Sequence, residues 1–230
     1  MAHVEVTWIG SVILASFILK FSIFCYVMYL NSHSWGSLLI SAMLLSCGSV
    51  LHSVCSLLAS TDFKKIGAIL SIIHMNMGMI SLYSPGLFGC YGSDMLWTGH
   101  SVVAGLFFFS VGSIYATSGA RLLHATLASM ASSPVCWYCV FSLGILNIGL
   151  PLGCLFAPEL LFVASLASLA TLLELCPWTA TLAALSILAL FTALRACLAC
   201  ETKIIINDFS TDTLIMFLPI LLWIWFLWPD

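Results

Sequence analysis

Four ionisable side chains lie deep inside long apolar stretches of this 230-residue sequence. They are Lys20, His74, His100 and Glu159. An ionisable group at membrane depth costs about 2.5–3.5 kcal/mol on insertion scales, so we expect each to face a protein interior or a water-filled path. A lysine, two histidines and a glutamate on four different apolar segments all exchange protons, and together they form a candidate proton relay.

Each of these residues also has a simpler interpretation. A lone histidine in a membrane helix is often a buried packing residue, and Lys20 alone would serve as an ion-pair anchor for a partner helix. Glu159 follows Pro158, which suits the first turn of a helix, where a carboxylate interacts favourably with the helix dipole. A broken helix with a carboxylate at its restart is also a device that transporters use for ions. The four residues as a set are more specific than any one of them.

The neighbours of His74 support an interior position. Ser71, Gly67 and Gly78 are spaced so that they share its face of a helix, and His100 likewise has small neighbours in "WTGHSVVAG". Small residues in a membrane helix allow water or a neighbouring helix to approach closely. Ser16 lies one turn before Lys20 on the same helix face.

The ten cysteines include two C-x-x-C pairs, Cys136 with Cys139 and Cys197 with Cys200. Paired C-x-x-C motifs can bind zinc. We reject a zinc site because both pairs lie at or inside predicted membrane spans without a surrounding histidine or acidic cluster. The sequence contains no iron–sulfur spacing and no G-x-G-x-x-G motif between a strand and a helix. We therefore expect this chain to bind no cofactor or metal, and any redox group to belong to another subunit.

Composition indicates an integral membrane protein. Hydrophobic residues make up 62% of the chain and charged residues 7%, whereas roughly a quarter of the residues in a soluble domain are charged. The net charge of −3 does not indicate a nucleic-acid partner. Few positive charges flank the apolar runs, so the orientation in the membrane stays open.

The apolar runs predict an all-α polytopic fold with about seven transmembrane helices, one of them broken. A helix needs about 20 residues to cross the hydrocarbon core, and short polar segments such as 84–94 separate the runs. We expect residues 1–230 to form one transmembrane domain. The predicted spans are 8–30, 35–58, 63–83, 92–116, 134–175 with its break, 177–199 and 212–228.

Five sequence blocks resemble chain 4 of NADH:ubiquinone oxidoreductase, the antiporter-like membrane subunit of respiratory complex I. The resemblance covers nearly the whole chain in collinear order, and the first three blocks are specific. They are "AHVEVTWIGSVILASFILK" (2–20), "STDFKKIGAILSIIHMNMGMISL" (60–82), "GHSVVAGLFFFSVGSIYATSGARLL" (99–123), "NIGLPLGCLFAPELLFV" (147–163) and "TDTLIMFLPILLWIWFLWPD" (211–230).

This resemblance implies a proton-translocating membrane-arm subunit of a complex that oxidises NADH. Lys20 is similar to the central lysine of the family's eighth helix, His74 and His100 to relay histidines of the tenth and eleventh, and Glu159 to the carboxylate of the broken twelfth. NADH, FMN, iron–sulfur clusters and ubiquinone would be bound by partner subunits. The implied location is the mitochondrial inner membrane, with a bacterial-type plasma membrane as the alternative.

The chain also departs from the family pattern. The resemblance covers an antiporter-like half-bundle, the C-terminal half of a fourteen-helix fold, so we expect a separate polypeptide with the other seven helices. Val6 and Thr7 replace the usual Ala-Pro, and Pro158 replaces the usual Gly before the glutamate. Two alternative functions are a structural membrane-arm scaffold that has lost pumping and a subunit of a multisubunit cation/proton antiporter. Other membrane-arm subunits and lipids are the expected partners.

Overall fold

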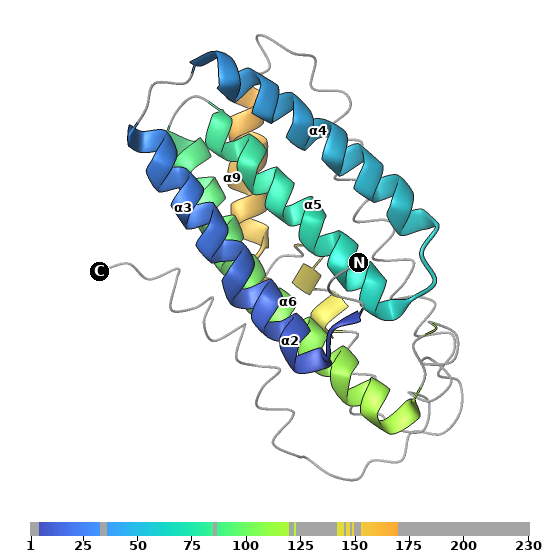
Figure 1. Ribbon diagram of the computed structural model, residues 1–230. Coiled ribbons are helices and arrows are strands. Elements are labelled where there is room, and N and C mark those ends of the chain that lie inside the picture. Colours follow the sequence, from blue (N-terminus) through green and yellow to red (C-terminus); the bar gives the residue numbers. More distant parts are fainter. Residues whose placement is uncertain are drawn as a thin grey trace.

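The described part of the computed structural model is helical, with no strand in it (Figure 1). An isolated β-bridge joins Asp62 to Leu122. This agrees with the predicted all-α class. The spans predicted at 177–199 and 212–228 lie outside the described residues. Those residues are 5–32, 36–84, 87–119, 122, 142–144, 146–147, 149 and 153–169.

The first membrane span is one continuous helix of three parts, α2 (Trp8–Ile13), a π-helical turn η1 (Leu14–Ile18) and α3 (Leu19–Ser32). A 22-residue stretch of it, Trp8–Tyr29, is long and apolar enough to cross a membrane. The predicted span 8–30 is therefore correct. The π turn inside it is a feature that the sequence did not predict.

Three long helices follow, and a fourth element restarts the chain after the break. These are α4 (Gly36–Leu58), α5 (Phe63–Tyr83), α6 (Leu87–Ser118) and α9 (Phe156–Leu169). Three stretches of the described residues meet the length and hydropathy of a membrane span, Trp8–Tyr29, Phe63–Tyr83 and Phe88–Ala116. The predicted total of seven crossings stays a prediction.

Helix α6 begins at Leu87, five residues before the predicted start at 92. The sequence interpretation treated the glycines of 84–94 as part of a loop. Gly89 and Gly92 lie in the first turns of α6, where they let it approach its neighbours. A Cβ on Gly92 would lie 3.1 Å from both the Ser81 Oγ on α5 and the Leu161 Cβ on α9.

Helices α5 and α6 form the centre of the described bundle. Figure 1 shows α5 between α4 and α6, and α6 contacts α2, η1, α5 and α9. About 61% of the most apolar part of α5 is buried, and 56% of that of α6, against 11% for the first helix. The two histidines, His74 and His100, are therefore carried by the most enclosed helices.

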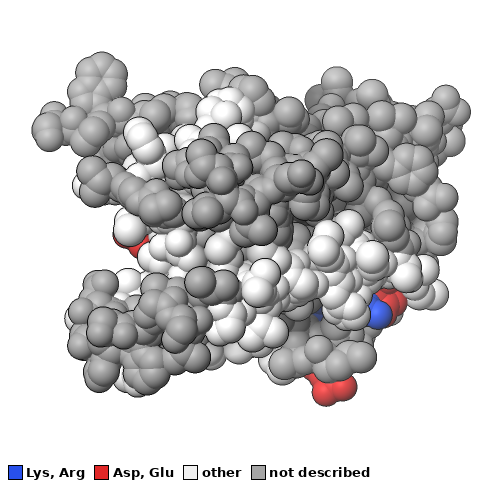
Figure 2. Space-filling view, turned by 90° about the horizontal axis from the view of Figure 1, so that it is seen from above, with Lys and Arg blue, Asp and Glu red and all other residues white. Residues whose placement is uncertain are grey.

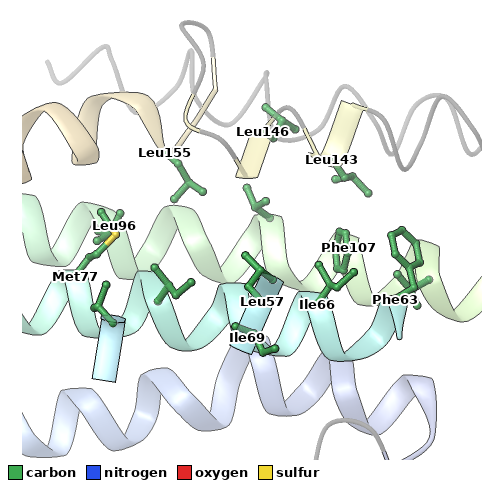
Figure 3. Packing of buried hydrophobic residues seen from close by; sticks show 14 of the residues in the cluster. Leu57, Phe63, Ile66, Ile69, Met77, Leu96, Phe107, Leu143, Leu146 and Leu155 are labelled. Atoms are coloured by element: carbon green, nitrogen blue, oxygen red, sulfur yellow. The ribbon is translucent and has the colours of Figure 1, made fainter. Parts of the chain in front are cut away.

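The main hydrophobic cluster fills the space between α4, α5, α6 and the segment around the break. In Figure 3, Leu143 and Leu155 point from that segment toward α5 and α6, and Leu146 belongs to the same cluster. At one end, the Phe63 and Phe107 rings pack with centroids 5.5 Å apart. This packing holds the restart of the broken helix against α5 and α6.

The outer face of the first helix is apolar. Four large side chains at helical spacing are mostly exposed on it, Phe17, Phe21, Phe24 and Met28. In Figure 2, most of the described atoms that are visible belong to uncharged residues. Such a surface suits lipid or another membrane helix, because neither requires it to be polar.

Candidate proton-transfer site

The structure brings all four sequence-predicted residues into one continuous series. Lys20 from α3 contacts His100 from α6, His100 packs on His74 from α5, and His74 faces Glu159 from α9. Their spatial order therefore differs from their order in the chain, because α6 lies between the first helix and α5.

The π turn gives the Lys20 side chain a backbone acceptor. In an α-helix the Leu19 N–H would donate to the Ala15 carbonyl, but here it donates to Leu14. The Ala15 carbonyl accepts a hydrogen bond of 2.6 Å from the Lys20 Nζ. The same Nζ lies 3.0 Å from the Nδ1 of His100. Lys20 is thus held by one backbone and one titratable acceptor.

Ser16 lies on the side of this helix that packs against α6. Its hydroxyl donates to the Val12 carbonyl within its own helix. A Cβ placed on Gly105 of α6 would lie 3.4 Å from the Ser16 Oγ. The small pair Ser16 and Gly105 therefore lets the two helices approach near Lys20.

The two histidines form a buried pair. Their ring centroids are 5.3 Å apart with the planes inclined at 41°, and the residues are 2% (His74) and 1% (His100) exposed. Within the described part of the chain, the Nε2 of His100 and both ring nitrogens of His74 lack a hydrogen-bond partner of normal geometry, and the Asn147 backbone lies close to His74. Buried polar atoms are normally hydrogen-bonded, so these nitrogens mark a place suited to water or to a moving proton.

Glu159 completes the series from the first turn of α9. Its Oε1 lies 3.9 Å from the Nδ1 of His74. Among the described residues, no hydrogen bond joins its carboxylate to an N–H group at the start of α9, although the backbone Glu159 N–H donates to the Leu155 carbonyl. The side chain is therefore directed toward α5, which a simple capping role would not require.

The small-residue stripe beside His74 admits aromatic rings of α6. A Cβ on Gly67 would overlap the Phe107 ring, and a Cβ on Gly78 would overlap the Trp97 indole. Ser71 between them donates to the Gly67 carbonyl over 3.0 Å. At Gly67 and Gly78 the small residues therefore allow the close approach of helix α6, one of the two neighbours, water or a helix, that the sequence predicts.

Sequence reasoning missed two features of the site. The Ala15 carbonyl has no side-chain signal, and nothing in the residue types of 14–18 predicts a π turn. The Trp97 Nε1 is a buried donor that has no partner among the described residues. Its position one turn before His100 on α6 is the signal that would have found it.

Among the described residues, no hydrogen bond joins a cysteine to Lys20, His74, His100 or Glu159. Both C-x-x-C pairs, Cys136 with Cys139 and Cys197 with Cys200, lie outside the described residues. Within the described ranges, the free thiols are those of Cys25, Cys47, Cys55, Cys90 and Cys154.

The arrangement can move a proton between neighbouring groups. Lys20 and His100 are within direct hydrogen-bond distance. The histidine rings are in contact. The His74 Nδ1 and the Glu159 Oε1 lie 3.9 Å apart, so a shift of about 1 Å would bring them to hydrogen-bond distance. The site thus contains the chemical groups and the spacing that a proton path requires.

Comparisons with known proteins find a matching family and several relatives. A family model described as "NADH:quinone oxidoreductase/Mrp antiporter, TM" matches residues 1–192. NADH-ubiquinone oxidoreductase chain 4 of Dictyostelium discoideum is 33% identical over 171 residues, covering 72% of this chain and 31% of that protein. Chain 4 of Caenorhabditis elegans is 30% identical over 165 residues, covering 71% and 40%. The chain thus spans about a third of the length of these relatives.

A solved structure has a similar fold. The chain resembles a subunit of the membrane-bound sulfane sulfur reductase, an archaeal respiratory membrane complex, with a TM-score of 0.76 and 18% identity. The likeness covers 94% of this chain and 46% of that one. At this identity it concerns the fold alone.

Proposed function

Because the chain belongs to the NADH:quinone oxidoreductase/Mrp antiporter transmembrane family, we propose that it carries part of the proton path in the membrane arm of a proton-translocating NADH:ubiquinone oxidoreductase. The relatives named above are chain 4 of that enzyme. The observation that carries the proposal is the continuous series Lys20, His100, His74 and Glu159, contributed by four helices.

In the proposed path, each residue has a definite part. The Lys20 ammonium gives a proton to the His100 Nδ1, which must then be the unprotonated nitrogen of that ring. His100 releases a proton from its Nε2 toward His74, and the Nδ1 of His74 exchanges one with the Glu159 carboxylate. A charge or conformational change arriving from the quinone-reducing part of the complex would bias Lys20 electrostatically, so coupling would not need a redox centre nearby.

The oxidoreductase chemistry would belong to other subunits. We propose that NADH, FMN, the iron–sulfur clusters and ubiquinone are bound there, because this sequence contains none of the motifs that such groups use. The complex would lie in the mitochondrial inner membrane, and other membrane-arm subunits and lipids would surround this chain.

We further propose that a separate polypeptide packs against the first helix. Phe17 and Phe21 on the outer face of that helix are more than 70% exposed, which leaves room there for the helices of a partner. By resemblance, this partner would contribute about seven spans with an intramembrane glutamate and lysine.

Purification of the complex in mild detergent, followed by mass spectrometry of its polypeptides, tests this function. The proposal predicts that this chain co-purifies with NADH- and quinone-binding subunits and with the seven-span partner. Peptides from a single longer chain would contradict the separate partner. Co-purification with antiporter subunits but no NADH-oxidising subunit would instead favour a multisubunit cation/proton antiporter. An intact complex in which variants of all four residues pump normally would favour the scaffold.

A further inference from the structure

We propose that Gly149 is a positioning residue for Glu159, because its lack of a side chain determines where the carboxylate stands relative to His74. Gly149 lies before the restart of the broken helix, ten residues before Glu159 in the chain. The inference deepens the proposed function and rests on it, since the position of the carboxylate matters only if Glu159 exchanges protons.

The first observation concerns the Gly149 backbone. Its φ is +67°, in the left-handed region where residues with a Cβ are strained. Its N–H points back to the Leu146 carbonyl over 3.4 Å, within the turn that leads to the break. A glycine is therefore favoured here by conformation alone.

The second observation is a contact that conformation does not require. A Cβ built on Gly149 would lie 2.8 Å from the Glu159 Oε1, 2.5 Å from its Cδ, and closer still to Oε2. The carboxylate thus occupies the space that a side chain at position 149 would fill.

The same carboxylate faces His74 on its other side. Its Oε1 is the atom that lies 3.9 Å from the His74 Nδ1, so the group is held between the Gly149 backbone and the imidazole. A methyl group at position 149 would force the carboxylate out of this position. Because proton exchange depends steeply on geometry, a shift of about 1 Å can cost up to about 100-fold in rate.

The chain contains a control that separates the two effects. Gly119 has nearly the same backbone conformation, with φ +66°, but a Cβ built there would meet nothing within 4 Å. Gly119→Ala therefore imposes the conformational strain without the contact. Gly149→Ala imposes both.

The test compares these variants in the assembled complex reconstituted into vesicles, with protons translocated and NADH oxidised measured together. We expect Gly119→Ala to pump like the wild type and Gly149→Ala to lose pumping by about tenfold, within the range that such misplacement produces. Glu159→Asp shortens the acidic side chain by one methylene, so Gly149→Ala combined with Glu159→Asp should pump better than Gly149→Ala alone. Equal losses in the two glycine variants, or no rescue by aspartate, would overturn the inference.

Assembly provides a second readout if Gly149→Ala fails to fold. Adding Glu159→Ala removes the carboxylate and leaves room for the methyl group, so the double variant should assemble. If it does not, the contact is not what requires glycine. Glu159→Gln separates the proton path from the positioning role of Gly149. If Glu159→Gln pumps fully, the proposed proton path is contradicted. If Glu159→Gln loses pumping while Gly149→Ala pumps normally, only the positioning role is contradicted.

Discussion

The Lys20 Nζ and the His100 Nδ1 lie 3.0 Å apart although 80 residues separate them in the chain. The contact joins α3 to α6, and a second acceptor, the Ala15 carbonyl, fixes the ammonium from the other side. Lys20 is therefore connected to the buried histidine pair, and through it to Glu159.

Replacing Lys20 by alanine should leave assembly intact and reduce the protons translocated per NADH oxidised. Assembly should survive because removing an interior charge relieves its desolvation cost, and no carboxylate among the described residues is left unpaired by the change. The measurement is the proton-to-NADH ratio in vesicles, with Lys65→Ala at the start of α5 as the control. Normal pumping in Lys20→Ala would remove the lysine from the path.

Lys20 and His100 should behave as one unit when both are replaced. If a proton must pass between them, the double variant Lys20→Ala with His100→Ala should pump as well as whichever single variant pumps less. Groups in contact commonly show coupling of about 0.5–3 kcal/mol in such cycles. If the fold-loss of pumping in the double variant equals the product of the two single losses, the residues act independently.

The glycines on α4 and α5 should respond oppositely to alanine. Gly67→Ala drives a methyl group into the Phe107 ring, and overpacking of this kind typically costs about 1–3 kcal/mol. A Cβ on Gly48 of α4 would meet nothing within 4 Å, so Gly48→Ala should be neutral or stabilise by roughly 0.5–1 kcal/mol. Thermal unfolding in detergent checks both, and an equal shift in the two variants would contradict the packing of α6 on α5.

A pair of hydroxyl groups joins the first helix to the C-terminal end of α5. Tyr26 and Tyr83 share a hydrogen bond through their hydroxyl groups. Either Tyr→Phe change should cost about 0.5–1.5 kcal/mol of stability, the net value of one hydrogen bond. The double variant should cost little more than one single change, and thermal unfolding of all three decides it. A fully additive loss would show that the two hydroxyls have separate partners.

The sequence predicted the described membrane helices well, because long apolar runs bounded by polar residues have a single solution in lipid. Helix α5 begins and ends at the predicted residues 63 and 83. The predicted start of α6 at residue 92 is wrong because glycine, a common loop residue, also serves close helix packing, as Gly92 does against Ser81 and Leu161.

The members of the site could also be predicted, because ionisable groups at membrane depth are rare and costly. Their spatial order could not. It depends on α6 lying between the first helix and α5, which is a tertiary arrangement with no local sequence signal. The Ala15 acceptor and the close approach of Gly149 to Glu159 depend on backbone geometry, which residue types alone do not indicate.

Proton translocation in Glu159→Gln tests the central claim most directly, because glutamine keeps the shape of the side chain and loses the titrating group. In vesicles containing the assembled complex, the account predicts fewer protons per NADH oxidised, or slower coupled turnover, with part of the activity retained in Glu159→Asp. Full translocation in Glu159→Gln, at normal levels of assembled complex, would contradict a proton path through Lys20, His100, His74 and Glu159.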